Sequence, residues 1–87
     1  MIDLYKNLPT LDLHGENKEI STVLINDFIE DNYKMKNKKV IIIHGLGTKI
    51  LLKNTQEVLK KNKYVESYKI DNFNAGQTIV EIRSRSS

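Results

Sequence analysis

Apolar and polar residues alternate along this chain with two different periods, and the changes of period mark the predicted elements. Segment 10–14, TLDLH, alternates with a period of two, which predicts a half-buried strand. After Gly15, apolar residues recur at helical spacing over 18–35, and Asn17 precedes them in the position of an N-cap. The β-branched run at 40–43 then predicts a buried strand.

The second half of the chain continues this order of elements. Gly45 and Gly47 predict a turn. Thr48 is placed to cap a second helix, which ends near Asn62. The remaining expected elements are a strand at 65–70, a turn-rich connection at 71–76 and a strand at 78–82.

The order strand, helix, strand, helix, strand, strand predicts the fold class. Two right-handed crossovers bring both helices to one face of the sheet. The result is a two-layer α/β sandwich with a four-stranded mixed sheet. The expected core positions on the helices are Ile20, Leu24, Ile25, Phe28, Ile29, Leu51, Thr55, Val58 and Leu59, with Met35 filling a gap.

The length of 87 residues predicts one small domain. Pro9 cannot donate a hydrogen bond to a sheet and directs the preceding residue away from helix, so residues 1–9 are expected to form a leader or linker. The domain itself is expected at 10–83, followed by a flexible tail at 84–87.

The composition excludes several classes of protein. The chain has no cysteine, which excludes disulfides, thiolate zinc sites and cysteine nucleophiles. No apolar run approaches the roughly 18 residues of a membrane span, and the N-terminus lacks the features of a signal peptide. We therefore expect a cytoplasmic protein without membrane association.

The charge favours acidic partners, because the formal net charge is +3 and the pI is about 9.2. Two lysine runs follow the predicted helices, namely Lys34, Lys36, Lys38 and Lys39, and Lys60, Lys61 and Lys63. Such runs are usually solvated helix ends, and only convergence with a phosphate-binding loop would make them part of a nucleic-acid track. Tyr64 and Tyr68 could stack on bases, but packing in the core or on the strand surface is favoured.

Two His-Gly dipeptides, His14-Gly15 and His44-Gly45, each follow a predicted strand and precede a helix. Because ligands of open α/β sheets bind beyond the carboxyl ends of parallel strands, both imidazoles are expected at one edge of the sheet. Two histidines can supply a general base and a general acid. Asp12 could orient or charge-stabilise an imidazole. The alternative is that each histidine only caps its strand through hydrogen bonds.

The loop before the second predicted helix is suited to a phosphate. Glycine lets the backbone approach an anion closely, and a helix N-terminus favours negative charge. The candidate phosphate-binding residues are Gly45, Leu46, Gly47, Thr48, Lys49 and Lys53. The loop lacks the P-loop spacing and the third glycine of a dinucleotide fingerprint, so a nucleotide cofactor is not favoured. An ordinary tight turn is the structural alternative.

Three motifs occur in order along the chain: LDLHG at 11–15, IIIHGLGT at 41–48 and GQTIVEI at 76–82. Their order and spacing resemble those of the Smr (small MutS-related) domain, over nearly the whole chain. The resemblance implies an α/β sandwich similar to the C-terminal domain of translation initiation factor three. It also implies nucleic-acid binding and, as in many members, endonuclease activity.

The resemblance assigns roles to particular residues. The Asp-Leu-His motif falls on Asp12, Leu13 and His14, and the His-Gly-x-Gly motif falls on 44–47. Asp12, His14 and His44 are therefore the expected catalytic residues.

The chain departs from the family pattern in two loops. Leu46 stands where many relatives have a basic residue, and Lys49 stands where glycine is common. Phe73 and Asn74 replace a usual glycine pair before the last strand. These departures bear on loop conformation and on the strength of binding, not on the fold.

The expected function is a nucleic-acid-binding domain with endonuclease activity, in DNA repair and recombination or in ribosome rescue. On RNA, one histidine would deprotonate the 2′-hydroxyl and the other would protonate the leaving oxygen, without a metal. DNA nicking would need an activated water and Mg²⁺ or Mn²⁺, with Asp12, Glu16 and Asp71 as candidate carboxylates. The sequence shows no tight metal-ligand cluster, so no metal site is assigned. The alternative is a non-catalytic module that binds DNA or RNA, or docks on a ribosome or a MutS-like ATPase.

Overall fold

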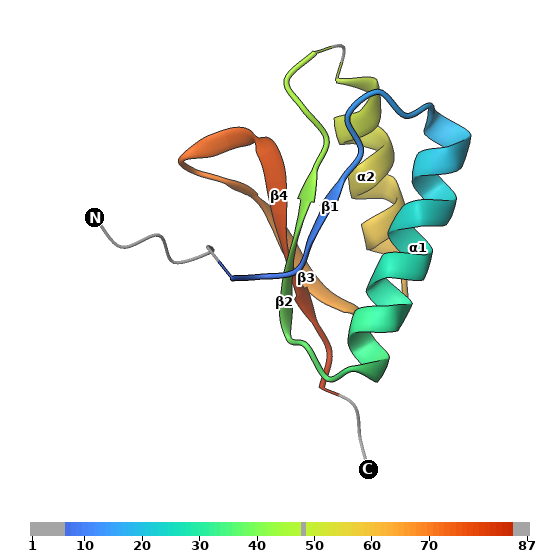
Figure 1. Cartoon of the computed structure of the whole chain (residues 1–87), viewed down its shortest axis with the longest axis vertical. Coiled ribbons are helices and arrows are strands. Elements are labelled where there is room, and N and C mark those ends of the chain that lie inside the picture. Colours follow the sequence, from blue (N-terminus) through green and yellow to red (C-terminus); the bar gives the residue numbers. More distant parts are fainter. Residues whose placement is uncertain (1–6, 48, 85–87) are drawn as a thin grey trace.

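A computed structural model describes residues 7–47 and 49–84, which form a sheet and a layer of two helices (Figure 1). The elements are β1 (Thr10–Asp12), α1 (Lys18–Lys34), β2 (Lys39–Ile43), α2 (Ile50–Lys61), β3 (Val65–Asp71) and β4 (Asn74–Ile82). Both helices cover the same face of the sheet. The predicted two-layer α/β sandwich is confirmed. Neither helix of the described residues is long and apolar enough to cross a membrane.

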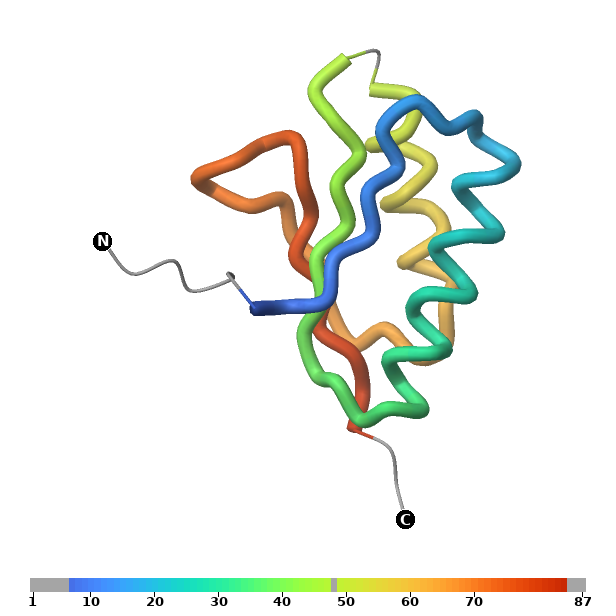
Figure 2. The backbone as a smooth tube through the Cα atoms, in the orientation of Figure 1, coloured from blue at the N-terminus to red at the C-terminus, as the bar shows by residue number. Residues whose placement is uncertain are grey.

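The sheet is mixed, with the strand order β1-β2-β4-β3. β1 and β2 are parallel, whereas β4 runs antiparallel to both of its neighbours, β2 and β3. Ile41 in the centre of β2 is paired with Thr10 of β1 and with Ile79 of β4. The carboxyl ends of β1 and β2 therefore meet at one end of the sheet, and the backbone trace shows the start of α2 at that same end (Figure 2).

The hydrophobic core lies between the helices and the covered face of the sheet. Its buried members are Leu13, Ile25, Ile29, Val40, Ile42, Val58, Leu59, Val65, Val80 and Ile82. Leu24, Phe28 and Leu51, which the helical spacing predicts as core, are partly buried against this cluster. The alternation of Val40 and Ile42 toward the helices follows from the period of two along a strand.

Two residues predicted as core are exposed. Ile20 is 47% exposed because it lies in the first turn of α1, where its N–H donates to the side chain of Asn17 at 2.8 Å. Met35 is 62% exposed because it is the C-cap residue of α1. The next residue, Lys36, has a left-handed φ of 64° and donates its N–H to the carbonyl of Tyr33, which closes the helix end.

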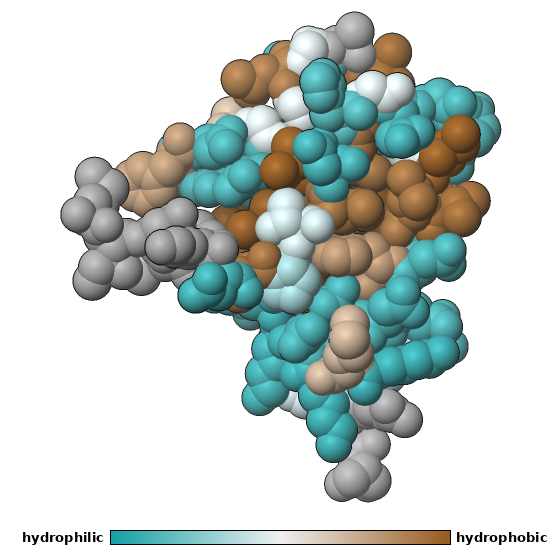
Figure 3. Space-filling model, viewed as in Figure 1, coloured by the Kyte–Doolittle hydropathy of each residue, from teal (hydrophilic) through white to brown (hydrophobic). Residues whose placement is uncertain are grey.

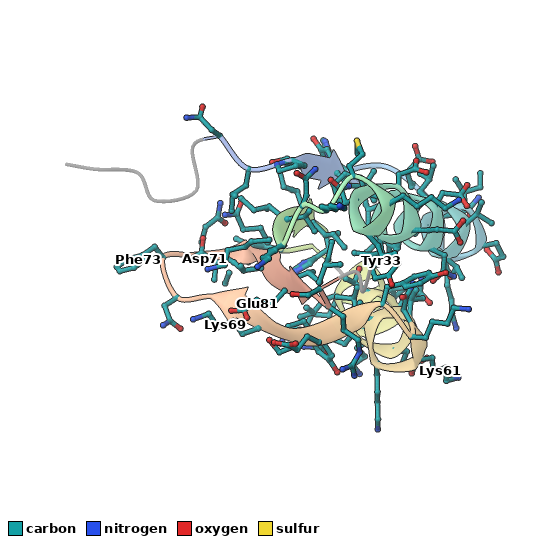
Figure 4. All side chains as sticks on the ribbon, turned by 90° about the horizontal axis from the view of Figure 1, so that it is seen from below. Tyr33, Lys61, Lys69, Asp71, Phe73 and Glu81 are labelled. Carbon is teal, nitrogen blue, oxygen red and sulfur yellow. The ribbon has the colours of Figure 1, made fainter. Side chains whose placement is uncertain are left out.

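The predicted connection at 71–76 is instead mostly a β-hairpin, because β4 begins at Asn74. Side chains close the hairpin: Asp71 accepts a hydrogen bond from the N–H of Phe73 at 2.9 Å, and Asn74 accepts one from the N–H of Gly76 at 3.0 Å. Phe73 points away from the tip (Figure 4) and is 96% exposed. The turn therefore forms without a glycine at 73 or 74, since side-chain acceptors fix its backbone.

The start of α2 differs from the prediction. Its N-cap is Lys49, without a side-chain hydrogen bond, and not Thr48. Thr48 lies outside the described residues, as do 1–6 of the predicted leader and 85–87 of the predicted tail. The helix ends at Lys61, one residue before the predicted Asn62.

Candidate functional site

The two His-Gly motifs meet in one pocket at the carboxyl ends of β1 and β2. Its volume is about 370 Å³. The residues that line it are His14, Gly15, His44, Gly45, Leu46, Gly47, Lys49 and Leu51. The prediction that both histidines lie at one edge of the sheet is therefore confirmed, and the pocket brings together segments that are about 30 positions apart in sequence.

The segment after β1 holds His14 at the surface. β1 ends at Asp12, two residues earlier than predicted, because the Asp12 carboxylate accepts a hydrogen bond from the backbone N–H of His14 at 2.9 Å and bends the chain. Between them, the buried Leu13 donates its N–H to Ile43 of β2 at 2.8 Å. The sequence suggested that Asp12 orients or charge-stabilises an imidazole, but its observed contact is with the backbone of His14. Within the described residues, the imidazole of His14 has no hydrogen-bond partner.

Both motif glycines have a backbone conformation that other residues rarely adopt. Gly15 has a φ of 83° and Gly45 a φ of 81°. In each motif the chain therefore turns sharply directly after the histidine, at a position where a side chain would be strained. This geometry explains why a glycine follows each histidine.

His44 is held inside the protein, with 4% of its surface exposed. Its Nδ1 lies 3.1 Å from the carbonyl oxygen of Gly45, and its Nε2 lies 2.8 Å from the hydroxyl of Thr78. Because a carbonyl can only accept, Nδ1 is assigned the hydrogen and Nε2 accepts from the Thr78 hydroxyl. Both ring nitrogens are therefore engaged inside the fold, as the structural alternative for a strand-end histidine requires.

The β3–β4 hairpin braces the loop that follows β2. The backbone N–H groups of His44 and Gly45 both donate to the carbonyl of Gly76, at 3.0 Å and 2.9 Å. Together with the bond between His44 and Thr78, these contacts fix the loop to β4. The third sequence motif thus supports the second, and the residues that do so, Gly76 and Thr78, were not among the predicted site residues.

The predicted phosphate-binding residues occupy different places. Leu46, Gly47 and Lys49 are exposed at the pocket, and Leu46 is 71% exposed. Lys53 lies on the first turn of α2, exposed and beside the pocket lining, with its N–H bonded to the carbonyl of Lys49 at 3.0 Å. Thr48 cannot be placed, because it lies outside the described residues. The pocket therefore has an exposed cation, Lys49, and glycine-rich backbone in its lining.

The candidate carboxylates do not gather at this pocket. Asp71 is buried in the hairpin, where it accepts hydrogen bonds from the N–H of Phe73 and from Gln77 at 2.8 Å. In the part of the chain that the structure describes, no three histidine, aspartate or glutamate side chains are grouped as metal ligands.

Replacing Thr78 with valine is expected to lower the free energy of unfolding by about 1–3 kcal/mol, because the buried Nε2 of His44 loses its only hydrogen-bond donor. Thr55 provides a matched control. It is equally buried, but its hydroxyl has no partner within the described residues. Thr55→Val should be neutral or stabilising. Urea denaturation of both variants measures the difference, and equal effects would contradict the structural role of the His44–Thr78 bond.

A family model described as the Smr domain matches residues 11–83, which include both His-Gly motifs and the bracing strand. This chain belongs to the Smr family. Among the relatives of this Smr domain, the protein named Endonuclease MutS2 from Halothermothrix orenii is 37% identical over 79 residues. The match covers 87% of this chain but 10% of that protein, so the chain spans about a tenth of the relative's length.

Solved structures agree on the fold of this Smr domain. The crystal structure of the Smr domain of Thermus thermophilus MutS2 matches with a TM-score of 0.84 at 24% identity, covering 87% of this chain and 99% of that one. YdaL, a stand-alone small MutS-related protein from Escherichia coli, matches with a TM-score of 0.74 at 21% identity, covering 86% and 64%. Neither comparison tests the predicted similarity to the C-terminal domain of translation initiation factor three.

Proposed function

We propose that this Smr domain binds a nucleic-acid strand, places one phosphate in the pocket between His14 and the loop 45–49, and cleaves the strand there. The observation that carries the proposal is the pocket itself. It combines an imidazole without a partner in the described chain, exposed glycine backbone and the Lys49 cation. The match to proteins named Endonuclease MutS2 supports the same class of reaction.

Binding of the phosphate follows from the start of α2. The N-cap residue, Lys49, makes no side-chain hydrogen bond to this helix, and the positive end of the helix dipole lies beside the pocket, where it favours an anion. Lys49 is the N-cap residue and carries its ammonium group to the same place. Lys53, on the first turn, adds a second cation near the phosphate path.

We assign proton transfer to His14, because its ring is exposed at the pocket while both nitrogens of His44 are engaged. His44 then acts as a positioning residue for the loop, and Asp12 positions the backbone of His14. The sequence-based prediction that Asp12, His14 and His44 are all catalytic stays a prediction.

The reaction differs between the two nucleic acids. With RNA, the 2′-hydroxyl loses its proton to His14 and attacks the phosphorus. The bond to the 5′ oxygen breaks, and this oxygen takes a proton from solvent, which leaves a cyclic phosphate and a 5′-hydroxyl. With DNA, water must be the nucleophile, and Mg²⁺ or Mn²⁺ would be required to activate it.

A cleavage assay tests the proposed function. Labelled single-stranded RNA and supercoiled DNA are each incubated with the protein in EDTA, in Mg²⁺ and in Mn²⁺. Cleavage of RNA in EDTA to cyclic-phosphate ends supports the metal-free route, and metal-dependent nicking supports the DNA route. If both nucleic acids are bound and neither is cut, the domain is a binding module, the candidate favoured by the engaged nitrogens of His44. If neither is bound, docking on a ribosome or a MutS-like ATPase takes its place.

Lys49 gives a prediction that couples stability to binding. Its φ of 67° lies in the left-handed region, so Lys49→Gly is expected to raise the free energy of unfolding by up to about 1 kcal/mol. The same variant should weaken binding and reduce the salt dependence by about one phosphate contact, because the cation is lost. Lys49→Ala removes the cation without relieving the backbone. Thermal denaturation and salt titrations compare the two, and unchanged binding by both variants would remove Lys49 from the site.

A further inference from the structure

The two basic runs of the chain meet at the end of the sheet opposite the pocket. The first run joins the end of α1 to the start of β2, and the second joins the end of α2 to the start of β3. The strand order places the start of β2, the end of β4 and the start of β3 side by side. This basic end is formed by Lys34, Lys36, Lys38, Lys39, Lys60, Lys61, Lys63 and Arg83, more than half of the 14 basic residues. Figure 3 shows a mostly hydrophilic surface over this lower part of the molecule.

A groove of about 190 Å³ lies within the basic end, lined by Lys36, Lys38, Arg83 and Ser84. Arg83 is fixed there by two contacts. Its backbone N–H donates to the carbonyl of Tyr64 at 2.8 Å, and its Nε donates to the carbonyl of Lys63 at 3.2 Å. Neither contact uses the two terminal nitrogens of the guanidinium group, whose planar arrangement suits phosphate.

The cations of the groove have no carboxylate partners in the described residues. At this end Lys34 forms an ion pair with Glu30 at 3.1 Å, and the hydrogen bond that Lys34 donates to the Glu30 carboxylate raises the pKa of Lys34. No ion pair is formed by Lys36, Lys38 or Arg83 within the described chain. Their positive charges are therefore not neutralised by ion pairs and lie close together, which favours binding of a polyanion.

The backbone at Lys36 points to the same conclusion. Among the described residues other than glycine, only Lys36 and Lys49 have a left-handed φ. Each is a lysine at a helix end, and each lines a cavity at one end of the sheet. Glycine at either position would relieve the strain of a positive φ. At both positions the chain instead has a lysine, which adds a cation at the cost of that strain.

The aromatic residues at the basic end serve the core. Tyr64 stacks on Tyr33 with a centroid distance of 4.3 Å, and the ammonium group of Lys63 lies 5.2 Å from the Tyr64 ring. Tyr68 packs against the core. The structural alternative for Tyr64 and Tyr68 is thus supported, and recognition at this end depends on charge.

We propose that the groove of Lys36, Lys38 and Arg83 is a second phosphate-binding site, which holds the same nucleic-acid strand that enters the pocket. This inference rests on the proposed function. The five residues of β2 separate the two sites by roughly 15–20 Å at about 3.3 Å per residue. At about 3.4 Å per nucleotide in a helical strand, this separation corresponds to about five steps. The second site thus defines the path of the strand across the domain and requires a substrate longer than a few nucleotides.

The test compares oligo(dT) of three and of twelve nucleotides in EDTA, because only the longer strand reaches both sites. The variant Lys38→Gln/Arg83→Gln removes two groove charges, while the backbone bonds at both positions remain. It should bind the twelve-nucleotide strand about tenfold more weakly, with the salt slope reduced by about 1.4. Its affinity for the three-nucleotide strand should stay within about twofold of wild type. Lys69→Gln, an exposed lysine of β3 outside both sites, is the matched control.

The outcomes separate the two proposals. Lys49→Gln should weaken binding of both lengths, since both use the pocket. If the groove variant weakens both lengths equally, or neither, the second site is wrong and the proposed function still stands. If the variant affects neither length, the cations of the groove would be assigned to contact with an acidic protein surface instead of a nucleic acid. If the wild-type protein binds neither strand at low salt, the second site is wrong, and the proposed function is restricted to RNA.

Discussion

Replacing His14 with alanine is expected to lower the rate of strand cleavage by about 10²–10⁴-fold, the usual contribution of a general acid or base. The free energy of unfolding should stay within about 0.5 kcal/mol of wild type, because the imidazole is exposed and has no partner in the described chain. Binding should persist, since the loop and Lys49 remain. Single-turnover cleavage, urea denaturation and a binding titration together measure these three quantities.

His44→Ala is the informative comparison, because it removes a buried ring that bonds Thr78 and Gly45. This variant should have lower cleavage activity. Its free energy of unfolding should also fall, by about 2–4 kcal/mol. Cleavage that survives in His14→Ala and is lost in a stably folded His44→Ala would reverse the assigned roles. The two-histidine mechanism would then need His44 to free one nitrogen from its present partners.

Replacing Leu13 with alanine is expected to cost about 2–5 kcal/mol, a large part of the roughly 5–15 kcal/mol of a typical domain. Leu13 is fully buried, and it connects Asp12 and His14 to the core. The substitution leaves a cavity directly beneath the segment that presents His14, so activity should fall even below the temperature of unfolding.

Leu46→Ala is the matched control for Leu13→Ala, because both leucines lie inside a histidine motif. Leu46 is 71% exposed, and its truncation should change stability by less than about 0.5 kcal/mol. Thermal denaturation of the two variants distinguishes them. A Leu13→Ala protein as stable as Leu46→Ala would show that the motif is not anchored through the core.

The element order and the meeting of the two histidines could be predicted, because both follow from periodicity and from strand direction. The parallel pairing of β1 and β2 alone brings His14 and His44 to one edge. Turn residues were harder, because side-chain acceptors decide their backbone. Asp12 ends β1 early, and Asn74 starts β4 early, through hydrogen bonds to N–H groups that no periodic pattern records.

The different environments of the two histidines could not be predicted from sequence. Both dipeptides look alike, yet His44 is buried against Thr78, 34 positions away, while His14 is exposed. The bracing role of Gly76 also depends on the antiparallel pairing of β2 and β4. The left-handed conformation of Lys49 is also decided by the fold, because nothing in the residue type of a lysine indicates a positive φ.

β1 has three residues and, among the strands of the described residues, lies at the edge of the sheet beside β2. Such a strand contributes few hydrogen bonds to the ladder, so it can separate at a small fraction of the free energy needed to unfold the whole domain. The two walls of the pocket therefore differ in their resistance to local unfolding. The loop after β2 is hydrogen-bonded to the central strand β4, whereas His14 follows the edge strand. A partner that adds a strand beside β1 would stabilise the His14 wall without touching the pocket.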